Sequence, residues 1–414
     1  MDDDLQIRFL GGSNKVGSLA MLLKTKGHQF LFDYGMTPSK PPEIPMPAPP
    51  VDTMFLSHSH LDHSGMTPLL CEHDDIPIFT TKITGIISNL LHKDSIKIAR
   101  SEGYAKPYSN AGIRKAKQSV KSVMPGQKKQ IEDMLVRFHS AGHIPGSLMI
   151  EIVASKRFLF TGDFNTVDTH LVKGTKPVKC DVLCMEGTYA GRNHPKPRAE
   201  LEQDFKDKVE EVIGRGGKVV LPAFAVSRSQ ELAMILRKMG LNVWYDGMGR
   251  KVSKIFLKHP DFLRNPGKLK KALNQMNFVH SDHGRKLALK ADVIITSSGM
   301  MDGGPVLHYM NKLKDDPKSA VLLTGYQVEG TNSRLLVEEG KLDFYGVKEK
   351  VSCEVEYFDF SGHAGHNQLV DFARKCNPEK IILMHSDARE ALKTPLEEFA
   401  DVFVPQNGEE IIVR

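Results

Sequence analysis

The chain is poor in cysteine. It has five cysteines in 414 residues, and no two of them form a CxxC pair. They are Cys71, Cys180, Cys184, Cys353 and Cys376. An odd number of scattered cysteines predicts neither a disulfide framework nor a zinc site built from thiolates. We expect buried thiols in a reducing compartment, and therefore a cytoplasmic protein.

Long apolar runs are also absent. No segment approaches the roughly 18 to 20 apolar residues that a membrane-spanning helix needs, and the start, MDDD, runs directly into an alternating strand pattern. We therefore expect no membrane association. Charge of one sign is barely in excess, because 56 Lys and Arg stand against 50 Asp and Glu. The net charge of +6 favours an anionic partner only weakly unless it is clustered.

One segment does concentrate positive charge. Residues 93–130 contain ten Lys or Arg and only two acids, Asp94 and Glu102. A solvated helix face explains such a segment, and so does a rim that meets a polyanionic substrate. The sequence leaves both interpretations open.

The most informative stretch is SHSHLDHSG, residues 57–65, which lies between an apolar strand pattern and a helix pattern. It places four metal-binding side chains within six residues: His58, His60, Asp62 and His63. At the observed frequencies of His and Asp, the pattern is expected by chance less than about once in a hundred chains of this length. Imidazole and carboxylate ligands suit zinc, and a two-metal site needs further ligands, one of them bridging. Loops after later strands supply the candidates His143, Asp163 and His385.

The remaining histidines carry a weaker signal. A lone histidine is more often a surface or hydrogen-bonded residue than a ligand, so we assign no metal to the following: His73, His92, His139, His170, His194, His280, His283 and His308. The pattern of apolar segments also changes along the chain. Between residues 196 and 339 strands and helices take turns, which predicts a separate domain with a parallel sheet.

Several motifs together resemble a known family. HSHLDH, AGHIPGS, TGDF and the strand that ends at Asp33 resemble the metallo-β-lactamase superfamily. PAFAVSRSQEL, WYDGMGRKV, SSGMMDGGPVLHYM and LLTGYQVEGTNSRLL resemble the inserted domain of the β-CASP nucleases, and FSGHAGHNQL and LMH resemble their later motifs. The resemblance runs from about Leu5 to Arg414. It is strongest to prokaryotic, mostly archaeal, homologues of the endonuclease subunit of the cleavage and polyadenylation specificity factor, which are related to RNase J.

The resemblance implies an α/β fold, a metallo-β-lactamase αββα sandwich with an inserted α/β β-CASP domain. The sandwich would come from residues 1–195 and 340–414, the insertion from 196–339, and the substrate would lie between them. One zinc would be held by His58, His60 and His143, and a second by Asp62, His63 and His385. Asp163 would bridge the two ions, and Asp33 would orient a histidine ligand.

The resemblance also implies catalytic and substrate-binding residues. Glu186 and His363 match the family's acidic and histidine motifs, although Gly187 stands where serine is usual; together with Asp62 they form the expected catalytic set. Glycine-rich turns at residues 297–305 and 325–334 let backbone N–H groups approach phosphates. The implied contacts to the nucleic-acid backbone are Arg228, Ser298, Thr331, Arg334 and His366. Simple loop geometry with surface charge remains the alternative for each of them.

The implied function is a zinc-dependent ribonuclease of RNA processing or decay, acting as a 5′ to 3′ exoribonuclease, as an endoribonuclease, or as both. RNA-directed members carry a histidine at the motif of His385, whereas the DNA-directed members generally lack it. An inactive RNA-binding scaffold subunit and a DNA-directed β-CASP nuclease are the alternatives. The seven ligand candidates argue against the scaffold. A homodimer and protein partners in RNA processing are further expectations from the resemblance.

Overall fold

The computed structural model describes residues 4–39, 41–72, 74–325 and 327–414. His73, and Tyr326 in the second glycine-rich turn, therefore lie outside the described residues. The chain divides into two compact units. Unit 1 comprises the residues up to Asp168, Lys173–Asn193 and Gly362–Arg414, and unit 2 comprises Thr169–Val172 and His194–Ser361. The domain boundaries drawn from the sequence motifs stay a prediction.

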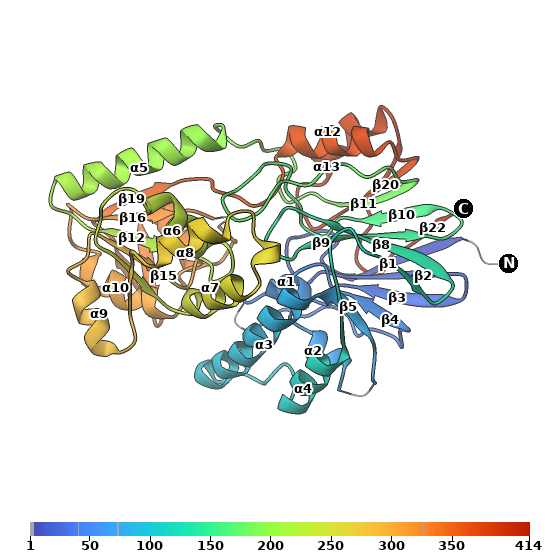
Figure 1. The fold of residues 1–414 in the computed structure, drawn as a ribbon, viewed down its shortest axis with the longest axis horizontal. Coiled ribbons are helices and arrows are strands. Elements are labelled where there is room, and N and C mark those ends of the chain that lie inside the picture. Colours follow the sequence, from blue (N-terminus) through green and yellow to red (C-terminus); the bar gives the residue numbers. More distant parts are fainter. Residues whose placement is uncertain (1–3, 40, 73, 326) are drawn as a thin grey trace. The chain divides into compact units, whose positions relative to one another are not determined.

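Unit 1 contains two sheets of seven strands each (Figure 1). The first has the order β22 (Glu410–Val413), β1 (Leu5–Gly11), β2 (Ala20–Thr25), β3 (His28–Phe32), β4 (Thr53–Phe55), β5 (Ile78–Thr81) and β6 (Val120–Val123). The second has the order β21 (Asp401–Phe403), β20 (Lys380–Met384), β11 (Val182–Glu186), β10 (Arg157–Phe160), β9 (Leu148–Val153), β8 (Met134–Ser140) and β7 (Lys128–Ile131).

The two sheets of unit 1 pack face to face. Period-two alternation aims Leu5, Ile7 and Phe9 of β1 at one core, which side chains of the second sheet complete. Aromatic rings meet across this layer, and the ring centroids of Phe32 and Phe160 are 4.9 Å apart. Burying such rings supplies a large share of the hydrophobic stabilisation of a sandwich. The core therefore holds the ends of all these strands in fixed positions.

Helices cover both outer faces of the sandwich. Outside the first sheet lie α1 (Leu61–Ser64), α2 (Thr67–Leu70), α3 (Lys82–Glu102) and α4 (Asn110–Ser119). Outside the second lie α12 (His366–Cys376) and α13 (Glu390–Glu397), whose apolar faces pack on Leu159 and Leu183. The layers are thus helix, sheet, sheet, helix, and the expected αββα sandwich is confirmed.

Unit 2 is built on a six-stranded parallel sheet, as the alternation of strand and helix patterns predicts. Its order is β14 (Asn277–Phe278), β13 (Val243–Asp246), β15 (Val293–Thr296), β12 (Val219–Pro222), β16 (Ala320–Leu323) and β19 (Glu354–Tyr357). A hairpin of β17 (Lys341–Phe344) and β18 (Val347–Lys350) joins it. Its helices are α5 (Arg198–Gly214), α6 (Arg228–Leu236), α7 (Gly249–Lys258), η1 (Pro260–Phe262), α8 (Pro266–Leu273), α9 (Asp282–Ala288), α10 (Pro305–Leu313) and α11 (Asn332–Glu339).

Helix α3 is the longest helix in the described part of the chain. The Thr81 side chain caps its first turn by accepting from Thr84 N–H, and it ends at Gly103, whose φ of 78° suits glycine. Its buried face includes His92, whose Nε2 lies 2.8 Å from the carbonyl oxygen of Ser64, the last residue of α1. Within the described residues, no helix combines the length and apolar character that crossing a membrane would require.

The buried His92 generates a prediction about acid stability. Burial lowers the pKa of His92 to about 4, although its bond to Ser64 opposes this. The unfolded chain therefore takes up a proton first, and the free energy of unfolding falls as pH drops from about 6.5 towards 4. We expect His92→Gln, which keeps a donor for Ser64 and does not titrate, to remove about 2 kcal/mol of the loss between pH 7 and pH 5.

The measurement is the urea midpoint of both proteins over that pH range. Other buried histidines contribute equally to the two proteins, so the difference reports on His92 alone. Parallel pH curves for the two proteins would contradict the assignment.

Candidate metal centre

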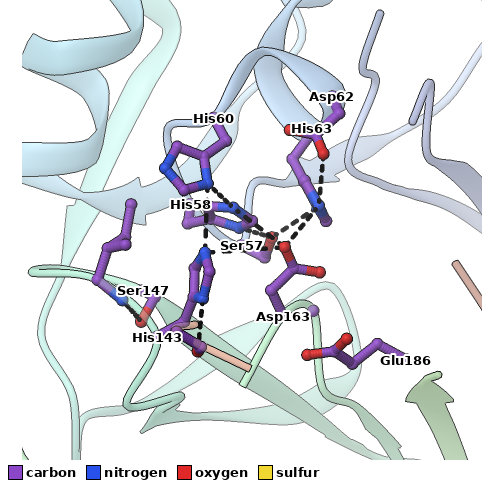
Figure 2. A network of polar contacts seen from close by, with 12 residues as sticks. Ser57, His58, His60, Asp62, His63, His143, Ser147, Asp163 and Glu186 are labelled. Atoms are coloured by element: carbon purple, nitrogen blue, oxygen red, sulfur yellow. Dashed lines mark hydrogen bonds and ion pairs between the residues drawn. The ribbon is translucent and has the colours of Figure 1, made fainter. Parts of the chain in front are cut away.

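The candidate ligands lie on loops that follow strands of unit 1. His58 and His60 come after β4, and α1 carries Asp62 and His63. The other three follow β8, β10 and β20, and are His143, Asp163 and His385. Because β4 belongs to one sheet and these three strands to the other, the sandwich brings together side chains that are far apart in the sequence (Figure 2).

The structure places the seven candidates in two neighbouring groups. His58, His60, His143 and Asp163 offer donor atoms that all lie within 4.8 Å of one another. Asp62, His63 and His385 form a second such group. Asp163 reaches both, since its Oδ2 is 3.3 Å from His63 Nε2 and its Oδ1 is 3.1 Å from His385 Nδ1. The resemblance implies the same division, and the binding of metal by these residues stays a prediction.

In the first group three imidazoles meet beside a single carboxylate, that of Asp163. His60 Nδ1 lies 3.1 Å from His58 Nε2 and 3.2 Å from His143 Nε2. Burial is the main cause that lowers the pKa of each of these imidazoles, and neighbouring imidazoles add to it. The rings are therefore neutral, and their lone pairs meet at a common point. A divalent cation can accept all three imidazole lone pairs, whereas a single proton shared among the rings cannot.

In the second group the charge pattern is the opposite. Burial by itself would lower the pKa of His63, but the carboxylates of Asp163, Asp62 and Asp33 outweigh it and raise the pKa well above its usual value. His63 Nε2 is buried and forms no hydrogen bond within the described residues. A buried ring nitrogen without a hydrogen bond, 3.3 Å from Asp163 and 3.9 Å from Asp62, is what a metal ligand shows when its ion is not counted. The residues therefore fit a bound cation.

Asp33 controls the direction in which His63 points. It is fully buried, with φ of 56°, and accepts hydrogen bonds of 2.7 Å from Ser57 N–H, from the Ser57 hydroxyl and from His63 Nδ1. Because Asp33 holds the proton on Nδ1, Nε2 is the nitrogen that faces Asp163 and would bind a metal ion. His143 is oriented in the same way, because its Nδ1 donates to the carbonyl oxygen of Gly362 at 2.8 Å.

The buried Glu186 and the partly buried His363 form a pair beside the ligands. The two carboxylate oxygens of Glu186 lie 3.0 and 3.1 Å from His363 Nδ1, and His363 Nε2 lies 4.0 Å from Asp163 Oδ2. Burial acts to lower the pKa of His363, but Glu186 and Asp163 outweigh it and raise the pKa to about 9. Glu186 is itself held by the N–H groups of Phe164 and Thr188. The pair can keep a proton ready at His363 Nε2.

The expected RNA contacts are divided between the two units. Arg228 begins α6, Ser298 follows β15, and both lie in unit 2. Thr331 caps α11, and the nearby Arg334 forms an ion pair with Glu338. His366 begins α12 in unit 1, where its Nδ1 accepts from Gly191 N–H at 3.0 Å. Their contact with RNA stays a prediction.

Sequence reasoning missed the residues that hold the ligand loops. Ser57 lies between Asp33 and His58, whose Nδ1 is 3.1 Å from the Ser57 hydroxyl. The hydroxyls of Thr81 and Thr84 donate to the carbonyl oxygen of Gly146, in the loop of His143, at 3.0 and 3.2 Å. The TxxT spacing signals a helix cap, but no local pattern shows that the cap reaches a loop more than 60 residues away.

Three family models match the chain. The metallo-beta-lactamase superfamily matches residues 14–223, the Beta-Casp domain residues 229–336, and the Zn-dependent metallo-hydrolase RNA specificity domain residues 348–405. A solved structure of a protein of unknown function from Enterococcus faecalis covers 99% of this chain and 100% of its own, with a TM-score of 0.62 and 14% identity. That likeness shows the fold alone.

Curated relatives match along nearly the whole chain. "Probable RNase MJ4" of Methanocaldococcus jannaschii is 35% identical over 98% of this chain and 100% of its own length. "RNase aCSPSF2" of Saccharolobus solfataricus is 36% identical over 98% of this chain and 85% of its own. "Transcription termination factor FttA" of Pyrococcus horikoshii is 30% identical over 94% of this chain and 67% of its own.

The bond between Asp33 and His63 generates a prediction about metal affinity. Asp33→Asn keeps the size of the side chain, but an amide N–H facing His63 Nδ1 favours the tautomer with the proton on Nε2. We expect the affinity for zinc to fall about 10- to 100-fold. The matched control is Glu151→Gln, which changes another buried carboxylate of unit 1, paired with Arg137 and His139.

Metal content and competition with a chromophoric chelator measure the effect. Equal zinc affinity in folded Asp33→Asn and wild-type protein would overturn the role given to Asp33.

Proposed function

The chain belongs to the metallo-beta-lactamase superfamily and carries a Beta-Casp domain, and from this we propose that it acts as a metal-dependent ribonuclease. Relatives named as RNases, which match over nearly its whole length, support RNA as the substrate. A matched RNA specificity domain points the same way. The observation that carries the proposal is the pair of donor groups sharing Asp163 beside Glu186 and His363.

For the metal we propose two zinc ions. His58, His60 and His143 would hold one, Asp62, His63 and His385 the other, and Asp163 would lie between them. The support is chemical, since imidazole with carboxylate suits zinc and two adjacent donor groups suit a two-metal site. When bound, the ions supply activated water and stabilise negative charge on the phosphate.

The chain's own residues would complete the reaction. Glu186 holds a proton on Nδ1 of His363, which leaves Nε2 of that ring facing Asp163. We propose that His363 donates the proton at Nε2 to the departing 3′ oxygen or stabilises the charge on phosphorus. Asp62, one of the ligands, would orient the water that attacks. The buried walls around these groups keep their charges unscreened.

The alternatives receive less support. An inactive scaffold needs none of the seven donors, yet all seven meet in two groups. A DNA-directed nuclease is disfavoured by His385 and by the relatives that are named as RNases. For the ribonuclease, we propose 5′ to 3′ exonucleolytic action, endonucleolytic action, or both.

Substituting single residues separates metal binding from catalysis. We expect His363→Asn to lower kcat by about 10²- to 10⁴-fold, the size of a general acid's contribution, with the metal content unchanged. Asp163→Asn should lose both activity and metal, because it removes the carboxylate that both donor groups share. The control is His139→Gln, at a histidine paired with Glu151. Undiminished RNA cleavage by His363→Asn would contradict the role of that residue.

Comparing substrates tests the nucleic acid and the mode of entry. We expect metal-dependent cleavage of RNA and none of DNA with the same sequence, and chelation should abolish the RNA cleavage. Cleavage of circular RNA would establish internal attack, whereas faster loss of 5′-monophosphate than of 5′-triphosphate RNA would establish entry from the 5′ end. If the RNA and the DNA were cleaved equally, the DNA-directed alternative would replace the proposal.

A further inference from the structure

The positive charge of the chain concentrates on α3, α4 and the strands that follow them. Residues 93–130 carry ten of the 56 Lys and Arg but only two of the 50 Asp and Glu. The rest of the chain is left with 46 Lys and Arg against 48 Asp and Glu. One other stretch is comparably basic: residues 250–271 of unit 2, with eight Lys or Arg and Asp261.

Eight of the ten cations of residues 93–130 are exposed, and we call these eight the basic face. They are Lys93, Lys97, Arg100, Lys106, Arg114, Lys117, Lys121 and Lys128. Among the described residues, none of the eight forms an ion pair with a carboxylate. Elsewhere on the surface such pairs are common, for example Lys375 with Asp371 and Arg374 with Glu398. Within the described residues, the cations of the basic face are thus not held in ion pairs by the protein itself.

The fold holds this charge outward. Lys93, Lys97 and Arg100 lie at positions i, i+4 and i+7 of α3, on one face of the helix along about 10 Å. Next to this row α3 packs against α4 through Ile96 and Ile113, as Figure 1 shows for the two helices. A row of cations at this spacing, with rigid backing, suits a flexible polyanion.

The basic face is tied to the candidate metal centre within unit 1. The row of cations on α3 begins at Lys93, directly after His92. His92 is hydrogen-bonded to Ser64, the neighbour of His63. The other end of the helix is bonded to the loop of His143 through Thr81. Residues 250–271 belong to unit 2, so it is the basic face of unit 1 that has a fixed relation to the catalytic groups.

We propose that the basic face binds the phosphate backbone of RNA, outside the few nucleotides held at the metal centre. This rests on the proposed ribonuclease function and adds a second contact surface to it. Charge complementarity selects the partner, because RNA carries a charge at every residue and the face presents cations without neutralising acids. The basic face would hold the body of a long RNA while a phosphodiester bond of that RNA is cleaved at the metal centre. An RNA of a few nucleotides bound at the metal centre would not reach the basic face.

Two charge-reversal variants test the proposal. One carries Lys93→Glu, Lys97→Glu and Arg100→Glu, and the other carries Arg114→Glu, Lys117→Glu and Lys121→Glu. The matched control carries Arg374→Glu, Lys375→Glu and Lys393→Glu, at two exposed positions of α12 and one half-exposed position of α13 that have acidic neighbours. All three proteins change net charge equally. Neutral Gln versions of the same sets replace any reversal that does not fold, as judged by circular dichroism.

Binding is measured by fluorescence anisotropy in a His363→Asn background, so that the RNA stays intact. The probes are an RNA of about 30 nucleotides and one of about 4, the lower end of single-strand site sizes. We expect both basic-face variants to bind the long RNA about tenfold or more weakly at low salt. The slope of log affinity against log salt should become shallower by about 2, for three lost phosphate contacts. Binding of the short RNA, and its cleavage in the otherwise wild-type protein, should not change.

If both basic-face variants bind the long RNA as tightly as the control variant does, the proposal is overturned, and an acidic protein becomes the better partner for this face. Equal weakening in all three variants also overturns it, because net charge and not the face would then be responsible. Failure of the proposed function looks different: the wild-type protein would leave the short RNA uncut in the presence of metal. The binding comparison can be read in either case.

Discussion

The buried carboxylate of Asp163 is the group on which the candidate site depends. It is 2% exposed and lies within 4.0 Å of five imidazoles, those of His58, His63, His143, His363 and His385. Burial alone would raise the pKa of Asp163, but His63, His385 and His363 hold it well below its usual value. A buried carboxylate stays ionised only when positive charge lies nearby, from protonated imidazoles or from a bound cation. Both donor groups, and the pair of Glu186 and His363, are arranged about this one carboxylate.

The rest of unit 1 keeps that arrangement rigid. Two backbone positions of the site, Asp33 and His385, have φ of 56° and 57°, which non-glycine residues seldom adopt. Such strain persists where the surrounding structure holds it, and here two packed sheets do so. Helix α3 adds a third support, because it bonds both to α1 and to the loop of His143. The same helix carries Lys93, Lys97 and Arg100 of the basic face, so one element connects the catalytic groups with the proposed RNA surface.

Much could be predicted from the sequence because the signals are local. The spacing in SHSHLDHSG aligns His58 and His60 on an extended backbone and points to a metal before any fold is known. The strand and helix periodicities indicate the parallel sheet of the second unit. The resemblance of the motifs to the β-CASP nucleases is confirmed by the matched domains. It also supplied the grouping of His143, Asp163 and His385 with the first motif, which no spacing could give.

What only the tertiary structure decided are contacts between distant segments. Asp33 and His63 are 30 residues apart, Thr81 and Gly146 are 65 apart, and Glu186 and His363 are 177 apart. The pKa directions of His63 and His363 follow from these contacts, since each depends on carboxylates from other strands. The sequence also left the basic residues 93–130 open between a solvated face and a substrate rim. Their exposure, their lack of neutralising acids among the described residues and their attachment to the metal centre come from packing. Residue type and local spacing determine which chemistry is available, whereas charge balance depends on neighbours that only folding brings together.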